Sequence, residues 1–159
     1  MILTTATRYH DISCGHRVVG HEGKCALLHG HNYRIHFTIA AKQGLDSVGR
    51  VLDFSVIKSL LCEWLEENWD HKFLAWDDDP IVRALMPSCS PAPGGKADNL
   101  WVVMQGSIVW VPFNPTAENI AQYLLEVIGP RLLPTRCKLL SVMVDETRKC
   151  SASVSGDLS

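Results

Sequence analysis

The sequence predicts an α+β fold in which helices cover one face of an antiparallel sheet. Residues 32–41 alternate apolar and polar side chains, which is the period of a half-buried strand. Residues 57–65 instead carry apolar side chains at the three- and four-residue spacing of a helix. Along the chain, such patterns follow one another as strand hairpin, helix, hairpin, helix and strand, which is an α+β order.

The first part of the chain is expected to form a hairpin and then a helix. Residues 2–16 are the expected partner of the strand at 32–41, although their alternation is weaker. The helix is expected to begin at Ser55, whose hydroxyl can cap the first turn. Asp53 is interpreted as a structural residue, at this helix start or at a loop near the metal site described below.

The middle of the chain is expected to leave the sheet and return. Residues 77–95 are rich in Asp, Pro, Ser and Gly, as is typical of a surface loop. After them, the apolar segments 100–104 and 107–111 flank Gln105-Gly106 and predict a β-hairpin. We therefore expect a single domain over residues 1–159, with a loop and hairpin insertion at about 77–110.

The last part of the chain is expected to form a helix and a strand. Thr116 can cap the helix, which should stop at Gly129-Pro130. Residues 138–146 alternate as a strand. The small polar residues after Lys149 are expected to fray.

Composition excludes several classes of function. The 159 residues, 47% of them hydrophobic, can bury one core but hardly two. A formal net charge of −2 gives no overall positive field for nucleic acid or for an anionic membrane. No segment has the pattern of a targeting peptide or the length of a membrane span, and the six cysteines are scattered. We expect a soluble, cytoplasmic protein with reduced thiols.

Three histidines form a candidate metal site. His29 and His31 are two residues apart at the expected start of a strand, so their imidazoles should share one face. His16, near the end of the preceding strand, can complete the set. Three neutral nitrogen ligands with an open fourth position are typical of catalytic zinc. The alternative is that these histidines are polar surface or core residues without a metal.

Four other residues are candidates for chemistry. Cys25 lies four residues before His29, where a metal or histidine would favour its thiolate, although an unpaired cysteine is usually a small buried hydrophobe. The Asp70-His71 pair suits acid–base catalysis, and His71 can equally be a histidine at a helix end. Glu146, at the end of the last strand, can accept two parallel hydrogen bonds from a heterocycle edge or can be an exposed residue.

In this order, the segments SCGH, CALLHGHNY, GRVLDF, WDHKFL, NPTAEN and MVDET resemble the 6-pyruvoyltetrahydropterin and 6-carboxytetrahydropterin synthase family, which has the tunnelling fold (T-fold). The resemblance runs from about residue 13 to residue 150, apart from the region near 77–110. It implies a zinc ion on His16, His29 and His31, catalytic roles for Cys25, Asp70 and His71, and substrate binding by Glu146 and Thr116. The three-residue spacer between Cys25 and HGH, and the VLDF segment, resemble the bacterial carboxy enzymes.

The resemblance also implies a reaction and an assembly. The reaction is the zinc-dependent conversion of 7,8-dihydroneopterin triphosphate into 6-carboxytetrahydropterin, a queuosine precursor, with release of acetaldehyde and triphosphate. Each subunit would have a four-stranded antiparallel sheet with two helices on one face. These sheets would associate into a barrel and form a homohexamer with sites between subunits. Two alternatives stay open, a pyruvoyl synthase without side-chain cleavage and a non-catalytic pterin- or metal-binding module. Cys14 adds a second thiol near the metal, and Arg17, Lys24 and Arg34 are candidates for holding the triphosphate.

Overall fold

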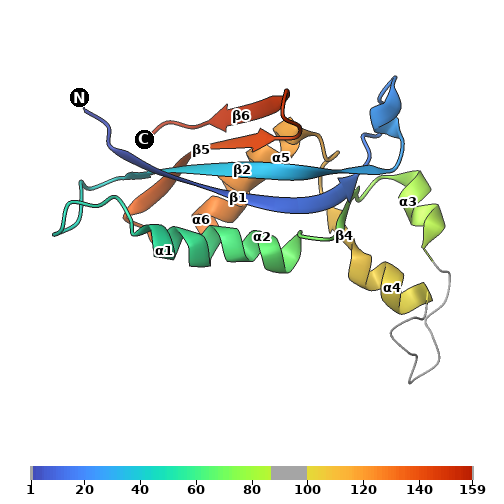
Figure 1. Cartoon of the computed structure of the whole chain (residues 1–159), viewed down its shortest axis with the longest axis horizontal. Coiled ribbons are helices and arrows are strands. Elements are labelled where there is room, and N and C mark those ends of the chain that lie inside the picture. Colours follow the sequence, from blue (N-terminus) through green and yellow to red (C-terminus); the bar gives the residue numbers. More distant parts are fainter. Residues whose placement is uncertain (1, 87–99, 159) are drawn as a thin grey trace.

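The computed structural model describes residues 2–86 and 100–158, which form a mixed sheet with helices packed against it (Figure 1). The strands are β1 (Thr5–His16), β2 (His29–Ala41), β3 (Phe73–Trp76), β4 (Ile108–Val111), β5 (Cys137–Asp145) and β6 (Ser151–Ser155). The α-helices are α1 (Phe54–Ile57), α2 (Glu63–Asn68), α3 (Pro80–Leu85), α4 (Leu100–Ser107), α5 (Ala117–Tyr123) and α6 (Gly129–Leu132). In the described part of the chain, no helix is long and apolar enough to cross a membrane.

The sheet has six strands in the order β4-β3-β1-β2-β5-β6. The four strands β1, β2, β5 and β6 pair antiparallel, whereas β3 pairs parallel with both β1 and β4. The α+β prediction is confirmed, but the expected four-stranded antiparallel sheet was wrong. It omitted the four-residue strand β3 and also β6, which forms where the chain was expected to fray.

The predicted hairpin at 100–111 is also wrong. Residues 100–107 form helix α4, and only 108–111 form a strand. The parallel pairing of β3 with β4 gives the physical reason, because parallel neighbours need a crossover connection, which is usually helical. The expected loop at 77–95 likewise contains α3, and its remaining residues from 87 onward lie outside the described residues.

Two long helical runs cover one face of the sheet. The first joins α1 to α2 through a π-helical stretch, Lys58–Cys62, and begins at Asp53, whose carboxylate accepts a hydrogen bond from the Ser55 amide at 2.8 Å. Asp53, and not Ser55, is therefore the N-cap. The second run is capped by Thr116 as predicted, and it continues past the expected stop because Pro130 occupies the first turn of α6, where no amide donor is needed.

The hydrophobic core lies between this sheet face and the two helical runs. Tyr33, Ile35 and Phe37 of β2 are each 1% exposed and belong to the same cluster as Leu65 and Leu124 of the helices. Burial of these side chains on one face of β2 fixes the strand register, since a one-residue slip would turn them to solvent. The same parity carries back to the start of β2, where His29 and His31 lie.

Candidate metal centre and active site

The long β1–β2 hairpin brings three histidines together. His16 is the register partner of His29, and His31 lies two residues further along β2. Between them, Gly15 faces Gly30. A Cβ at Gly30 would lie 3.1 Å from the Cys14 carbonyl oxygen, which is a tight contact. One nitrogen of each imidazole lies within 4.8 Å of the others. The predicted clustering of the three side chains is thus seen at the end of the helix-covered face.

Backbone carbonyls orient two of these rings. His16 Nδ1 lies 2.7 Å from the Pro115 oxygen, and His29 Nδ1 lies 2.7 Å from the Leu27 oxygen. Because a carbonyl can only accept, each Nδ1 carries the proton and donates it. The Nε2 lone pairs of both rings therefore face each other at 3.1 Å. Carbonyl contacts of this kind are the usual second-sphere support of metal-binding histidines.

The protonation states also suit a cation. Burial lowers the pKa of His16, against the opposing effects of the Pro115 hydrogen bond and the Glu146 charge. Burial likewise lowers the pKa of His31, whose Nε2 has no hydrogen-bond partner among the described residues. Neutral imidazoles with converging lone pairs repel one another unless a cation lies between them. Two nitrogens of a tetrahedral zinc site are about 3.3 Å apart, so this cluster fits such an ion.

Glu146 follows β5 and turns its carboxylate toward the cluster. Its Oε1 lies 3.5 Å from His16 Nε2 and 3.7 Å from His31 Nε2. Glu146 also lines an open cleft of about 1160 Å³, together with His31, Asp70 and His71. Three of the sequence-predicted groups therefore share one cleft, which is large enough for a substrate of small-molecule size.

Asp70 and His71 form a hydrogen-bonded pair at the end of the first helical run. His71 Nδ1 donates to Asp70 Oδ2 at 2.7 Å, and the Ser13 amide donates to Asp70 Oδ1 at 2.8 Å. Burial opposes ionisation of Asp70, but the hydrogen bonds from Ser13 and His71 outweigh it and lower the pKa of Asp70. His71 has a left-handed backbone with φ of 57°, which lets two adjacent side chains meet. Within the described ranges, His71 Nε2 has no hydrogen-bond partner, and the His71 side chain is 83% exposed.

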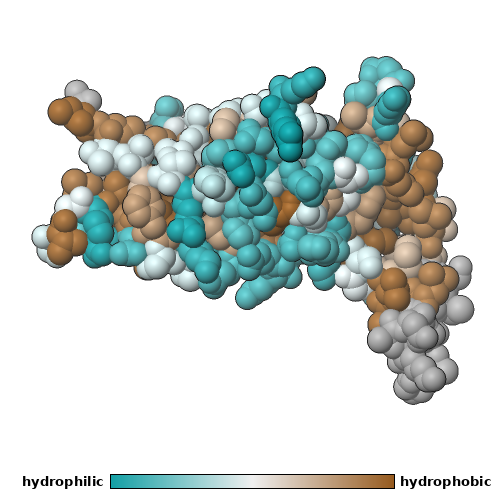
Figure 2. Space-filling view, in the orientation of Figure 1, coloured by the Kyte–Doolittle hydropathy of each residue, from teal (hydrophilic) through white to brown (hydrophobic). Residues whose placement is uncertain are grey.

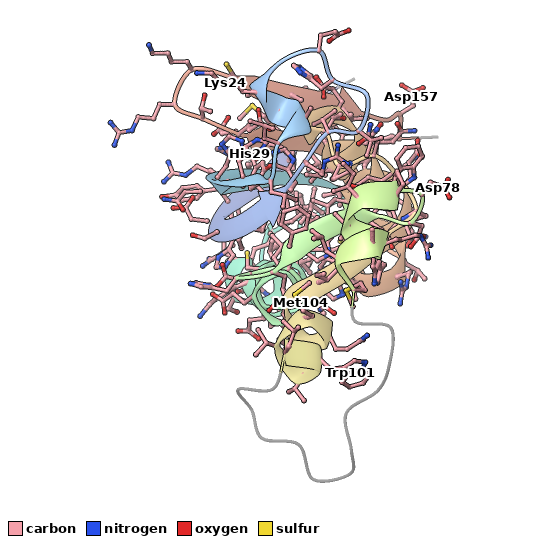
Figure 3. The ribbon with its side chains drawn as sticks, turned by 90° about the vertical axis from the view of Figure 1, so that its right-hand side faces the viewer. Lys24, His29, Asp78, Trp101, Met104 and Asp157 are labelled. Atoms are coloured by element: carbon pink, nitrogen blue, oxygen red, sulfur yellow. The ribbon has the colours of Figure 1, made fainter. Side chains whose placement is uncertain are left out.

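Cys25 and Thr116 line a second, smaller cavity of about 260 Å³, and Glu146 lines this cavity too. Cys25 lies in a short 3₁₀ turn, Lys24–Ala26, within the loop that joins β1 to β2. Figure 3 shows Lys24 on this loop above His29 at the start of β2. Glu146, Cys150 and Ser151 line both the cavity with Cys25 and the cleft with the Asp70-His71 pair.

Cys14 differs from Cys25 in its surroundings. It is 5% exposed and lies opposite His31 in the hairpin register. Burial, with a smaller contribution from the Asp70 charge, raises the pKa of Cys14 to about 12. Cys14 is therefore a protonated core residue at neutral pH, and the additional thiol near the histidines is not a nucleophile.

Two of the proposed triphosphate contacts are already engaged within the chain. Arg17 Nη1 donates to Asp79 Oδ1 at 2.6 Å, and the Arg17 side chain is only 9% exposed. Arg34 Nε donates to Asp11 at 2.8 Å, and both residues line the cleft that holds Asp70, His71 and Glu146. Lys24 is exposed. The burial of Arg17 and Asp79 was missed from the sequence, although Asp79-Pro80 is a recognisable helix start.

Asn114 is a further residue that the sequence did not single out by itself. Its side-chain oxygen accepts from the Val19 amide and its amide donates to the Val19 carbonyl, both at 2.9 Å. The neighbouring Pro115 carbonyl holds His16. The start of the NPTAEN segment therefore supports both the histidine cluster and the loop that carries Cys25.

Comparison with known proteins places the chain in a family. The family model described as 6-pyruvoyl tetrahydropterin synthase matches residues 5–157. The 6-carboxy-5,6,7,8-tetrahydropterin synthase of Rickettsia typhi is 36% identical over 149 residues, which cover 93% of this chain and 97% of that protein. A probable enzyme of the same name from Halobacterium salinarum is 34% identical, covering 89% of this chain and 79% of that protein.

Solved structures agree with the sequence matches. A protein of uncharacterised function from Wolinella succinogenes has a TM-score of 0.82 and 27% identity, covering 99% of this chain and 100% of the other. The 6-pyruvoyl tetrahydropterin synthase of Caenorhabditis elegans has a TM-score of 0.62 at 20% identity, covering 99% and 98%, which supports the fold alone. The predicted kind of enzyme is confirmed, and the chain belongs to the 6-pyruvoyl tetrahydropterin synthase family.

Proposed function

We propose that this chain is a zinc-dependent 6-carboxytetrahydropterin synthase. The reaction converts 7,8-dihydroneopterin triphosphate and one water into 6-carboxy-5,6,7,8-tetrahydropterin, acetaldehyde and triphosphate. The carrying observation is the convergence of three imidazoles, two of them oriented by carbonyls, in a chain whose relatives at about 35% identity carry this enzyme's name.

His16, His29 and His31 would hold the zinc ion. Bound there, zinc supplies Lewis acidity toward the side-chain hydroxyls of the substrate and favours loss of the adjacent protons. Imidazole nitrogen is a preferred zinc ligand, and three such ligands leave a coordination position for substrate. Protein zinc content, and its loss on substitution of these histidines, tests this part of the proposal.

Cys25 and the Asp70-His71 pair divide the proton transfers in this proposal. Cys25 acts as a thiolate base on the substrate side chain. Asp70, whose lowered pKa favours the carboxylate, holds His71 in one tautomer by accepting a hydrogen bond from Nδ1–H. His71 then exchanges protons through Nε2 with other positions of the substrate. An exposed imidazole next to a carboxylate suits this relay, since the product proton can leave to solvent.

Glu146 and Thr116 would bind the pterin ring. Glu146 can accept two parallel hydrogen bonds from a ring N–H and an amino group. Thr116 lies in the same cavity, although its Oγ1 also accepts from the Asn119 amide at 3.2 Å as the cap of α5. Placing the ring beside Glu146 puts the substrate side chain next to the histidines, which the Glu146 carboxylate already approaches.

The proposed assembly is a homohexamer, with sites completed between subunits. Strands β4 and β6 lie at the two edges of the sheet, and unpaired edges favour association with another chain. Hydrophobic residues also gather on the surface over α3 and α4 (Figure 2), where Ile81, Leu85 and Leu100 are each more than half exposed. Light scattering tests this point, and a stable active monomer would contradict it.

Product analysis decides the reaction. Incubation of the zinc-loaded protein with 7,8-dihydroneopterin triphosphate should give 6-carboxytetrahydropterin and acetaldehyde, identified by mass spectrometry. A three-carbon pyruvoyl side chain in the product would instead identify the pyruvoyl synthase reaction, for which the family model is named. Binding of the pterin without any product would leave a non-catalytic module as the function.

A further inference from the structure

The loop between β1 and β2 is held at Cys25 by two neighbouring hydrogen bonds. The Val18 amide donates to the Cys25 carbonyl at 2.7 Å. Arg17 Nε donates to the next carbonyl, that of Ala26, at 2.8 Å. Two successive peptide groups, one on each side of the Ala26 Cα, are thus fixed to the residues that directly follow His16. The main chain of Cys25 is tied to a metal-ligating strand.

Arg17 is itself held by a buried carboxylate. Its Nη1 donates to Asp79 Oδ1 at 2.6 Å, and Asp79 is 0% exposed. Asp79 Oδ1 also accepts the Ile81 amide at 2.9 Å and so caps α3. The guanidinium therefore bridges two places, the Cys25 loop through Nε and the start of α3 through Nη1.

The carboxylate at position 79 is more costly than a helix cap requires. Asp79 Oδ2 is buried and has no hydrogen-bond partner within the described ranges. Ser, Thr or Asn caps a helix about as well without a charge. A buried charge is tolerated when an opposite charge compensates it, and Arg17 is that charge. Capping of α3 therefore does not explain the buried ion pair. The bond from Arg17 to the Ala26 carbonyl does explain it.

The base of the same loop has an independent anchor. Asn114 binds both backbone groups of Val19 at 2.9 Å. These two bonds keep the first part of the loop, at Val19, fixed even when Arg17 is replaced. The returning part, with Cys25 and Ala26, has the Arg17 bond as its side-chain anchor. A change at Arg17 should therefore loosen Ala26 and shift the turn that carries Cys25, while the Val18–Cys25 backbone bond and the Asn114 contacts keep the rest of the loop folded.

We propose that Arg17, fixed by Asp79, is a positioning residue that sets the place of Cys25 relative to the three histidines. It acts through the backbone of Ala26 and does not contact substrate. This inference rests on the proposed function only for the role of Cys25 in turnover. It replaces the sequence-based expectation that Arg17 holds the triphosphate, because two of its nitrogens are engaged and the side chain is buried.

The test measures the loop directly by hydrogen–deuterium exchange, without substrate, next to kcat, KM, zinc content and Tm. Arg17→Met should speed exchange in residues 17–28, with strands β1 and β2 unchanged. It should lower kcat by roughly 10- to 100-fold, the effect of misplacing a catalytic group by about 1 Å, with little change in KM or zinc. Arg17→Lys should recover little, because one ammonium replaces a fork that binds two partners.

The double variant Arg17→Met/Asp79→Asn separates positioning from stability. Removing both charges should restore Tm toward that of the parent, yet exchange in 17–28 should stay fast and kcat low, because Ala26 still lacks its donor. The matched control is Arg50→Met, which breaks an Arg–Asp pair elsewhere and should change neither readout. Recovery of kcat together with Tm would overturn the proposal. So would a raised KM with normal kcat and normal exchange, since that result marks a substrate contact.

Because the exchange readout needs no turnover, the two proposals can fail separately. Faster exchange in 17–28 with an unexpected reaction product would reject the proposed function and keep Arg17 as the residue that holds the loop. The expected product from an Arg17→Met variant with unaltered exchange would do the reverse.

Discussion

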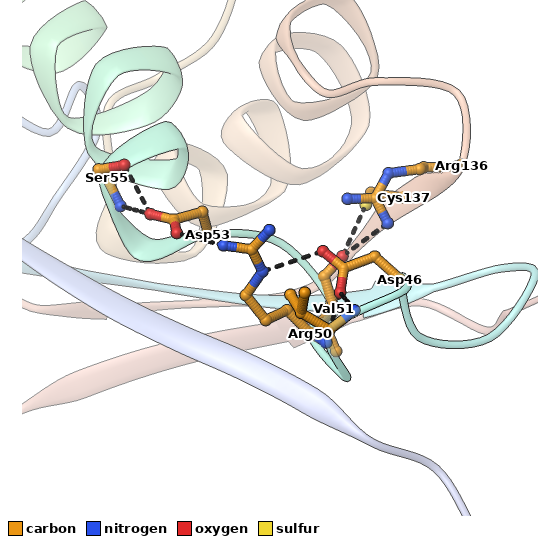
Figure 4. A network of polar contacts seen from close by, with 8 residues as sticks. Asp46, Arg50, Val51, Asp53, Ser55, Arg136 and Cys137 are labelled. Atoms are coloured by element: carbon orange, nitrogen blue, oxygen red, sulfur yellow. Dashed lines mark hydrogen bonds and ion pairs between the residues drawn. The ribbon is translucent and has the colours of Figure 1, made fainter.

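Two Arg–Asp pairs among the described residues have an aspartate that caps a helix, and they lie at opposite ends of the sheet. Asp79 caps α3 and binds Arg17 beside the histidine cluster. Asp53 caps α1 and binds Arg50 at 2.8 Å, and Arg50 also reaches Asp46 (Figure 4). The side chains of the first pair are 9% and 1% exposed, against 50% and 42% for Arg50 and Asp53.

This difference in exposure determines how much each ion pair matters to the protein. At the far end, hydrogen bonds from Ser55, with a smaller contribution from Arg50, lower the pKa of Asp53, and solvent screens the ion pair. At the histidine end, water is excluded, and each charge depends on the other. An exposed pair can be lost with little effect, whereas loss of one partner of the buried pair leaves an uncompensated charge.

The largest expected effect is loss of the metal at the histidine end. His29→Ala and His31→Ala should each remove most of the zinc and abolish turnover, because two imidazoles cannot replace a three-ligand site. Elemental analysis of the purified variants, with Arg50→Met as the reference from the far end, measures this. Full zinc content in both histidine variants would reject the cluster as a metal site.

Next in size is the loss of the proposed base. Cys25→Ala should keep zinc and Tm but lower kcat by roughly 10²- to 10⁴-fold, the usual contribution of a positioned proton-transfer group. Steady-state rates and zinc content of the same preparation give the answer. Normal turnover of Cys25→Ala, or loss of its zinc, would show that Cys25 has another role.

Glu146→Ala should act mainly on binding. Two charge-assisted hydrogen bonds to the pterin edge would be lost, each typically contributing about 1.5–3 kcal/mol, so KM should rise by at least roughly tenfold. Zinc should stay bound, because the three histidines remain. Titration with substrate and with a pterin lacking the triphosphate measures this, and an unchanged KM for both would remove Glu146 from the binding site.

Replacing the arginine of the buried pair should lower the free energy of unfolding more than replacing the arginine of the exposed pair. Arg17→Met leaves Asp79 buried without a counter-charge, which typically costs about 3–5 kcal/mol. Thermal or denaturant unfolding measures the free energy of unfolding for this variant and for Arg17→Met/Asp79→Asn, which should lie closer to the parent. Equal stability of the parent and Arg17→Met would mean that the pair contributes nothing to folding.

The smallest expected effect is that of Arg50→Met. The exposed guanidinium contacts Asp46 and Asp53, but the Asp53 cap keeps its bond from the Ser55 amide without it. Tm should therefore hardly change, and kcat should stay within twofold of the parent. A clear loss of activity in Arg50→Met would show that the two ends of the sheet are coupled and would break the comparison.

Much of the histidine end follows from local rules that a sequence expresses. The HxH spacing places His29 and His31 on one face, and the hairpin places His16 across from them. The Asp70-His71 contact was also anticipated, but the left-handed backbone that permits it was not. Sequence patterns give strand parity directly, because parity depends only on counting residues.

Features that depend on distant pairing could not be predicted in this way. Asp79 meets Arg17 across 62 positions, and no periodicity links the two residues. The strand β3 is only four residues long, and β6 alternates only one alanine and one valine with serines, which is too weak an apolar pattern to predict a strand. Segment 100–104 is rich in apolar residues that favour strands, but the parallel pairing of β3 and β4 requires a crossover there.

The left-handed backbone at His71 limits how this position can change through evolution. Glycine, asparagine and aspartate adopt such a φ most readily, and none of them offers an imidazole. Ser13 accepts the His71 amide at 2.7 Å and donates to Asp70, so this geometry is locked onto β1. A single substitution at position 71 by one of these residues would therefore relieve the backbone strain and remove the imidazole proposed to transfer protons. In a lineage that no longer needs this proposed role, position 71 should be among the first to change.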